Sequence, residues 1–134
     1  MKIRLSTIIA ATIALVAITY FTDPEQADAA YKPVPEQILS RALQSKPPAR
    51  GTVGKRAWAV CRVWRGVNCR AVLNVAWCES TLRPWARNGQ YAGIFQMGSS
   101  ERARFGHGRS TWAQARAARG YFLVSGFAPW ECRP

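Results

Sequence analysis

Residues 69–80 read CRAVLNVAWCES, and residues 88–96, a short distance further along the chain, read NGQYAGIFQ. In the first stretch, Val72, Val75 and Ala76 recur at helical spacing and form one apolar stripe, and Glu79 falls on the same stripe. Asn68 comes directly before this stretch, where an asparagine side chain is a favoured helix cap. The spacing therefore predicts a helix over residues 69–80 that carries a carboxylate on its apolar face.

The second stretch contains the clearest β-strand signal of the chain. Asn88-Gly89 is a dipeptide typical of a tight hairpin turn, and residues 90–97 after it are rich in strand-forming side chains. Because the surrounding sequence has helical periodicity, the fold class predicted here is α+β and mostly helical, with one small β-hairpin inserted after the helix at residues 69–80.

The chain before and after this region divides by composition. Residues 30–52 hold four of the eight prolines and are predicted to be a linker, within which residues 35–43 could form a short helix. The folded domain is expected over residues 53–134. Its last helix is predicted from a capping box, with Thr111 as the cap and Gln114 three positions later, and it should end near Gly126.

Residues 1–29 have the pattern of a secretory signal peptide. Lys2 and Arg4 precede an uncharged run over residues 5–21, and Ala-Asp-Ala at residues 27–29 matches a cleavage site. An uncleaved membrane anchor is the alternative, because the apolar run is marginally long enough to span a bilayer. In both cases we expect an exported protein, either secreted or held at the cell envelope.

The composition excludes several classes of protein. Of 134 residues 49% are hydrophobic, and aromatic residues continue to the chain end, which excludes an intrinsically disordered protein. A single long apolar run excludes a polytopic membrane protein. The net charge of +12 indicates an anionic partner such as a cell-wall polymer, or else simply a solvated arginine-rich surface. The arginines are spread along the chain and form no compact motif for specific nucleic-acid binding.

The four cysteines are expected to form disulfides, because an exported chain enters an oxidising compartment. They are Cys61, Cys69, Cys78 and Cys132, and their spacings contain no close pair of the kind that binds zinc. His107 is the single histidine, so we expect no metal site. Four cysteines allow three pairings, and the spacing alone leaves all three open.

Three acidic residues follow position 53, namely Glu79, Glu101 and Glu131. Glu101 lies in a polar stretch and is predicted to be solvated and paired with arginine. Glu131 lies close to the chain end. Glu79 is on an apolar face, where burial disfavours its charged form and raises its pKa, as a general acid requires. The alternative is a side chain whose tip reaches solvent or is neutralised by a neighbouring arginine.

Three motifs share one family pattern. Glu79-Ser80 at a helix end, the hairpin ending in Gly-Ile-Phe-Gln at residues 93–96, and the terminal Pro-Trp-Glu-Cys at residues 129–132 resemble the lysozyme-like lytic transglycosylases. The resemblance is greatest to small secreted actinobacterial forms related to resuscitation-promoting factors, and it covers residues 58–134. It implies a lysozyme-like fold, the pairing Cys61–Cys69 and Cys78–Cys132, no cofactor, and a monomer that binds peptidoglycan glycan strands.

The resemblance also implies roles for individual residues. Glu79 would protonate the glycosidic oxygen between N-acetylmuramic acid and N-acetylglucosamine. Gly93 would let the glycan approach the backbone, and Gln96 would bind the sugar or brace Glu79. Tyr91, Phe95 and Trp112 are candidate stacking faces, with a place in the core as the alternative for each, and for Phe95 the core is the expectation. The substrate-binding set is Ser80, Tyr91, Gly93, Gln96, Trp112 and Tyr121, the last being the nearest late tyrosine to the one that larger transglycosylases use.

The reaction type follows from the acids near Glu79. Because residues 80–100 contain no acid, Glu79 is predicted to act without a second carboxylate on that wall of the cleft. The substrate's own 6-hydroxyl would then be the nucleophile, and the product would carry a 1,6-anhydromuramyl end. The alternatives are a hydrolytic lysozyme and a non-catalytic cationic protein that binds the cell wall.

Overall fold

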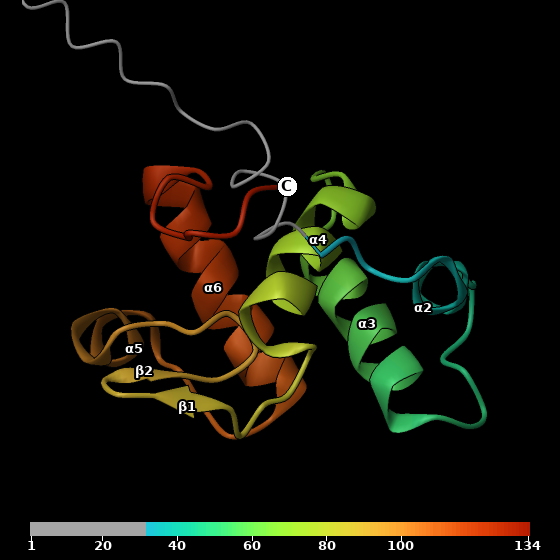
Figure 1. The fold of residues 1–134 in the computed structure, drawn as a ribbon, viewed down its shortest axis with the longest axis horizontal. Coiled ribbons are helices and arrows are strands. Elements are labelled where there is room, and N and C mark those ends of the chain that lie inside the picture. Colours follow the sequence, from blue (N-terminus) through green and yellow to red (C-terminus); the bar gives the residue numbers. More distant parts are fainter. Residues whose placement is uncertain (1–31) are drawn as a thin grey trace, which may run out of the picture.

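The computed structural model describes residues 32–134, and the predicted signal peptide or anchor over residues 1–29 lies outside them. The elements in chain order are α2 (Glu36–Ala42), α3 (Thr52–Val63), α4 (Cys69–Ser80), β1 (Arg87–Asn88), β2 (Tyr91–Ala92), α5 (Ser99–Phe105) and α6 (Thr111–Ser125) (Figure 1). The described chain is therefore α+β and mostly helical, with one antiparallel two-stranded sheet. Within residues 32–134, no helix is long and apolar enough to cross a membrane.

The core is built around Trp64, the residue that follows α3. Helix α3 packs against α2, α4 and α6, and α5 packs against α6 (Figure 1). The Trp64 side chain is fully buried, and its indole N–H donates to the carbonyl of Ala115 in α6 at 3.1 Å. Four aromatic rings surround it with centroids 5.1–6.4 Å away, those of Phe95, Phe122, Phe127 and Trp130. The core thus joins α3, α6, the segment after the hairpin and the chain end.

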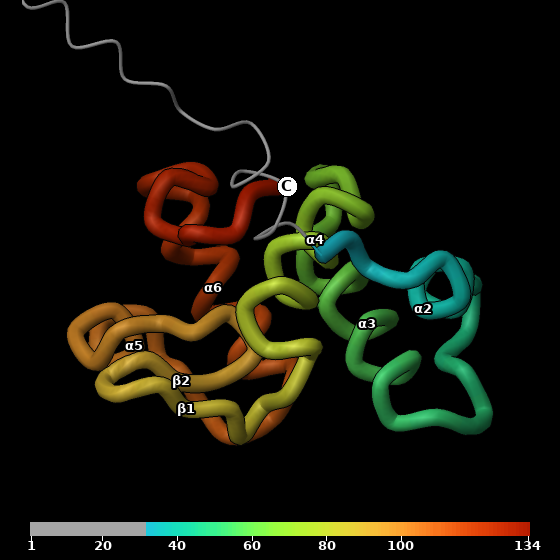
Figure 2. The backbone as a smooth tube through the Cα atoms, in the orientation of Figure 1, coloured from blue at the N-terminus to red at the C-terminus, as the bar shows by residue number. Residues whose placement is uncertain are grey.

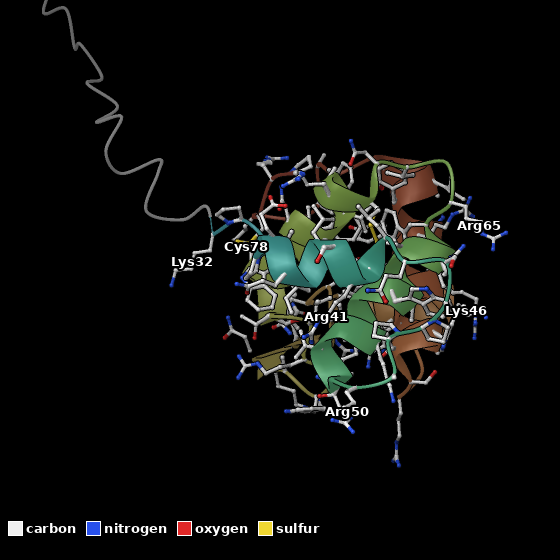
Figure 3. All side chains as sticks on the ribbon, turned by 90° about the vertical axis from the view of Figure 1, so that its right-hand side faces the viewer. Lys32, Arg41, Lys46, Arg50, Arg65 and Cys78 are labelled. Carbon is white, nitrogen blue, oxygen red and sulfur yellow. A yellow bond between two sulfur atoms is a disulfide. The ribbon has the colours of Figure 1, made fainter. Side chains whose placement is uncertain are left out.

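The segment predicted as a linker is part of the folded domain, which corrects the boundary at residue 53. Val34, Leu39 and Ala42 are all buried in the core. The backbone N–H of Val34 donates to Oδ1 of the buried Asn74 in α4 at 3.1 Å. Figure 3 shows α2 lying across α3. The prolines suggested a linker, but the short apolar stripe of α2 buries enough surface against α3 to order this segment.

Basic side chains surround α2 without converging. Figure 3 labels Lys32, Arg41, Lys46, Arg50 and Arg65, which lie at separate places on this face of the molecule. All five are exposed. On this side of the molecule the positive charge is therefore a dispersed and solvated surface.

Helix α4 and its cap agree with the sequence prediction. The helix covers Cys69–Ser80, and Oδ1 of Asn68 accepts the N–H groups of Arg70 and Ala71 at 2.9 and 3.4 Å. These bonds satisfy two of the free donors at the helix start. At its other end the helix is terminated by Thr81 in the left-handed conformation, with φ of 52°.

The hairpin is confirmed, but its strands are shorter than predicted. Arg87 pairs with Ala92 and Asn88 with Tyr91, so the two residues at the turn are Gly89 and Gln90, not Asn88 and Gly89. The predicted strand over residues 90–97 continues for two residues only. Residues 93–96 form a turn that is closed by a bridge between residues 92 and 97. The apolar side chains in this turn are buried because they pack against the helices. A short apolar run of this kind has the same sequence pattern as a paired strand, so the strand was predicted to be too long.

Helix α6 begins at the predicted residue but with a different cap. The cap is Ser110, whose Oγ accepts the N–H of Ala113 at 3.1 Å, and Thr111 is the first helical residue. Gln114 is 2% exposed and makes its hydrogen bonds to other segments, so the capping box is absent from this helix start. The helix ends before Gly126, as predicted.

Candidate active site

Glu79 lies in the last turn of α4, where the helix meets the chain end. Its side chain is half-buried, and its Oε1 accepts the backbone N–H of Cys132 at 3.3 Å. Burial raises the pKa of Glu79, and the negative charge of Glu131 raises it further, while backbone N–H groups of Cys132 and Glu131 oppose the shift. The outcome is a carboxyl group that holds its proton at higher pH than an ordinary glutamate.

Both disulfides have the pairing implied by the family resemblance. Cys61 is joined to Cys69, close by in sequence, and Cys78 is joined to Cys132 across 54 positions with a Cα–Cα distance of 5.8 Å. Figure 2 shows the C-terminal segment returning to the side of α4. Since Cys78 precedes Glu79, the second bridge holds the end of the chain against the candidate acid.

This bridge brings a second carboxylate to the site that the sequence reasoning left out. Glu131 precedes Cys132, so pairing Cys78 with Cys132 places Glu131 beside Glu79. Both glutamates line the same cleft. The sequence already indicated that the two glutamates lie close together, because each cysteine of the predicted bridge has a glutamate next to it.

The cleft has a volume of about 540 Å³. It is formed by the end of α4, the segment leading into the hairpin, the hairpin itself and the residues before Cys132. Its lining residues are Glu79, Arg83, Trp85, Ala86, Arg87, Asn88, Tyr91, Gln96, Pro129, Trp130 and Glu131. One of these residues, Trp130, is buried and donates its indole N–H to the carbonyl of Phe95 at 2.7 Å, which fixes its position in the wall. Phe95 itself is buried, as expected.

Three of the predicted site residues are brought together in this cleft, namely Glu79, Tyr91 and Gln96. Tyr91 is 46% exposed and presents an aromatic surface. The amide nitrogen of Gln96 donates to the carbonyls of Gly93 and Ala86 at 2.9 and 3.2 Å. Gln96 therefore braces the hairpin turn, and the backbone N–H of Cys132, not Gln96, bonds to Glu79.

Two predicted binding residues are enclosed within the fold. Ser80 is 3% exposed, and its hydroxyl donates to the carbonyl of Ile94 at 2.7 Å, which ties α4 to the turn after the hairpin. Gly93 has φ of +86°, and a Cβ added there would lie 2.6 Å from His107 Nε2 and 2.7 Å from Gln114 Oε1. Gly93 is thus required for close packing against these side chains and not, as predicted, for the approach of a glycan.

The remaining predicted aromatic residues lie outside the cleft. Trp112 packs edge-on against Trp58 of α3 with ring centroids 5.9 Å apart, and it does not line the cleft. Tyr121 packs against Phe105 and Trp130 and lines a smaller cavity of about 270 Å³ next to the cleft.

Glu101 lines the same smaller cavity and differs from its predicted state. It is partly buried in the first turn of α5, and its Oε1 accepts the hydroxyl of Ser100 at 3.0 Å. The predicted pairing with arginine is not found, since the ion pair recorded for residues 32–134 joins Arg70 and Glu36. A carboxylate in a first turn is stabilised by the helix dipole, which accounts for its position without an arginine.

Sequence reasoning also missed Trp85, Arg83 and Arg87 on the cleft wall. Trp85 is 66% exposed, and the guanidinium of Arg56 lies 4.6 Å from the centre of its ring. An exposed tryptophan at a cleft is well suited to stack on a sugar ring. The position of Trp85 between the helix of Glu79 and the hairpin could have indicated that it lies at the cleft.

The described part of the chain contains no cluster of three or more histidine, cysteine or acidic side chains that could hold a metal ion. All four cysteines are in disulfides. The side chains that line the cleft supply two carboxyl groups, two guanidinium groups, two amides and three aromatic rings.

Searches with this chain against protein-family models, curated proteins and solved structures each found no significant match. The functional argument therefore depends on the geometry of the cleft and on the motifs in the sequence.

Proposed function

We propose that the protein is a secreted peptidoglycan-cleaving enzyme with a lysozyme-like fold, in which Glu79 is the general acid. The single observation that carries the proposal is the state of Glu79, a half-buried carboxyl group with a raised pKa at the wall of an open cleft. A raised pKa increases the fraction of Glu79 that is protonated at a given pH, and a protonated carboxyl group can give its proton to a leaving oxygen. The exposed rings of Trp85 and Tyr91 on the same wall are suited to sugar rings.

The reaction begins when Glu79 donates its proton to the glycosidic oxygen of the MurNAc–GlcNAc bond. The bond from that oxygen to the muramic C1 breaks, and the carbonyl oxygen of the 2-acetamido group stabilises the positive centre at C1. In transglycosylation the 6-hydroxyl then attacks C1 and gives its proton to the Glu79 carboxylate. The acid is thereby regenerated, and the product has a 1,6-anhydromuramyl end.

Hydrolysis is the second candidate reaction, and the position of Glu131 favours it. The expectation that Glu79 acts alone took account only of residues 80–100, whereas the Cys78–Cys132 bridge brings Glu131 to the same cleft from the chain end. A second carboxylate can orient a water molecule toward C1, as in glycosidases that use two carboxyl groups. Water would then take the place of the 6-hydroxyl.

Digestion of purified glycan strands tests the proposal and separates the two reactions. Anhydro ends, identified by mass spectrometry, would establish transglycosylation, and products about 18 mass units heavier, the mass of one water, would establish hydrolysis. We expect Glu79→Gln to lower the rate by about 10²–10⁴-fold with the fold preserved, because glutamine cannot transfer the proton. Glu36→Gln, at an exposed site on α2, is the matched control and should keep full activity. Binding to strands without cleavage by the wild type would contradict the proposal.

A further inference from the structure

A second cavity, of about 460 Å³, adjoins the active-site cleft. Its lining residues are Pro84, Trp85, Ala86, Arg87, Ala92, Arg102, His107, Gly108, Arg109 and Gln114. Three of these residues, Trp85, Ala86 and Arg87, also line the cleft, so the two spaces share one wall. A molecule held in the cleft can therefore extend a substituent into this second cavity, which we call the cationic pocket.

The pocket is lined by three arginines and one histidine, and none of its lining residues is acidic. Arg102 is held in place because its guanidinium donates to the carbonyls of Gln90 and Met97. Arg87 and Arg109 are exposed, and the ion pair found in residues 32–134 involves neither of them. Their charges are thus available to a ligand, and with Arg102 they surround one cavity, unlike the dispersed basic side chains around α2.

The floor of the pocket is fixed by packing. Gly93 lies so close to His107 and Gln114 that a Cβ there would overlap both side chains. Burial lowers the pKa of His107, and the positive charge of Arg102 lowers it further, so the imidazole is neutral near pH 7. A neutral imidazole offers a ring nitrogen as a hydrogen-bond donor beside the arginines.

We propose that the cationic pocket binds the carboxylates of the peptide attached to the glycan strand. The inference rests on the proposed function, because it takes the cleft to hold the glycan. Guanidinium groups pair with carboxylates through charge-assisted, often bidentate hydrogen bonds. In peptidoglycan the stem peptide is joined to muramic acid and carries free carboxylates close to the sugar. The shared wall of Trp85 to Arg87 favours a ligand that is covalently part of the same strand over a separate anionic polymer.

The test compares two forms of one substrate, namely short glycan strands that carry their stem peptides and the same strands from which an amidase has removed them. The variant is Arg109→Gln, since Arg109 lines the pocket but not the cleft. The substitution keeps the backbone carbonyl of residue 109, which accepts a hydrogen bond from Gln114. Arg116→Gln is the matched control, because Arg116 is also an exposed arginine and lines neither space. We expect Arg109→Gln to raise KM about fivefold on peptide-bearing strands and to leave KM on bare strands unchanged, as removal of one exposed ion pair implies.

Binding to the Glu79→Gln protein, measured by calorimetry, separates failure of this inference from failure of the proposed function. If the wild type cleaves no strand but Arg109→Gln still weakens binding of peptide-bearing strands selectively, the pocket is established and the proposed reaction is wrong. If the wild type cleaves both strands and Arg109→Gln acts equally on both, the inference is overturned and the proposed function stands. An equal loss in Arg116→Gln would also overturn it.

Discussion

Glu79 and Glu131 lie far apart in the sequence and meet because a disulfide joins their neighbours. Burial raises the pKa of Glu79, and the charge of Glu131 adds to the shift. Like charges repel, so the negative charge of Glu131 makes the proton of Glu79 harder to remove. At this scale, the acidity of the candidate catalyst is set jointly by a helix end and by the residue before the last cysteine.

The pair predicts a directional change in the pH profile. A general acid acts in its protonated form, so kcat/KM should fall as the pH rises through the pKa of Glu79 in the folded protein. Glu131→Gln removes the repulsion, lowers the pKa of Glu79 and should move this fall to lower pH. Well below the ordinary glutamate pKa of 4.5, Glu79 is protonated in both proteins, and this effect should vanish there.

The measurement is kcat/KM on soluble glycan strands between pH 3 and pH 9. Glu131→Asp, which keeps the charge, is the control and should leave the fall close to its wild-type position. A profile for Glu131→Gln that superimposes on the wild type, or that moves to higher pH, would show that Glu131 does not act on Glu79.

At the scale of elements, the connection between α6 and the segment around the hairpin depends on one buried amide. Oε1 of Gln114 accepts the N–H of Ile94 at 2.9 Å, and Nε2 donates to the carbonyl of Pro84 at 2.9 Å. On the other side, the hydroxyl of Ser80 at the end of α4 donates to the carbonyl of Ile94. The two bonds to Ile94 hold the turn after the hairpin against α4 and α6, and so they position the wall that carries Trp85 and Tyr91.

We therefore expect Gln114→Ala to lower the free energy of unfolding by about 2–4 kcal/mol, because a buried N–H and a carbonyl lose their partner. Gln37→Ala, on the exposed side of α2, is the control and should change it by less than about 0.5 kcal/mol. Urea titration followed by circular dichroism measures both values. If the two variants were equally stable, the amide of Gln114 would not hold the elements together.

At the scale of the whole molecule, the two disulfides differ in what they constrain. The Cys61–Cys69 bridge closes a loop of 8 positions and the Cys78–Cys132 bridge one of 54. Loop-closure entropy assigns them about 2.5 and about 4 kcal/mol of stabilisation respectively. The longer bridge also carries the backbone N–H that bonds to Glu79, so stability and site geometry are coupled through it.

Replacing Cys78 and Cys132 together by alanine should thus cost more stability than replacing Cys61 and Cys69, and only the first change should reduce activity at a temperature where both variants are folded. Denaturant titration and a cleavage assay on the two double variants provide the comparison. Equal activity in both variants would mean that the chain end contributes nothing to the state of Glu79.

Features that depend on neighbouring residues were predictable. The helix over residues 69–80, its Asn68 cap and the hairpin follow from periodicity and turn chemistry, which operate within a few positions. Of the candidate site, Glu79, Tyr91 and Gln96 line one cleft, and all three come from the motif around the helix end and hairpin. The cap of α6 was misassigned by one residue, since Ser110 and Thr111 are adjacent and both are good caps.

The remaining features depend on which segments pack together across the chain. Ser80 and Gly93 are buried by contacts with segments distant in the sequence, and α2 is ordered in the same way. Glu79 and Glu131 likewise meet across a long stretch of chain, which local sequence patterns do not detect. The same holds for the cationic pocket, whose arginines come from the hairpin, from α5 and from the loop before α6. Local sequence specifies the elements because their hydrogen bonds and caps are short-range. The site was decided by the tertiary structure, because burial and charge proximity arise only when distant segments share one core.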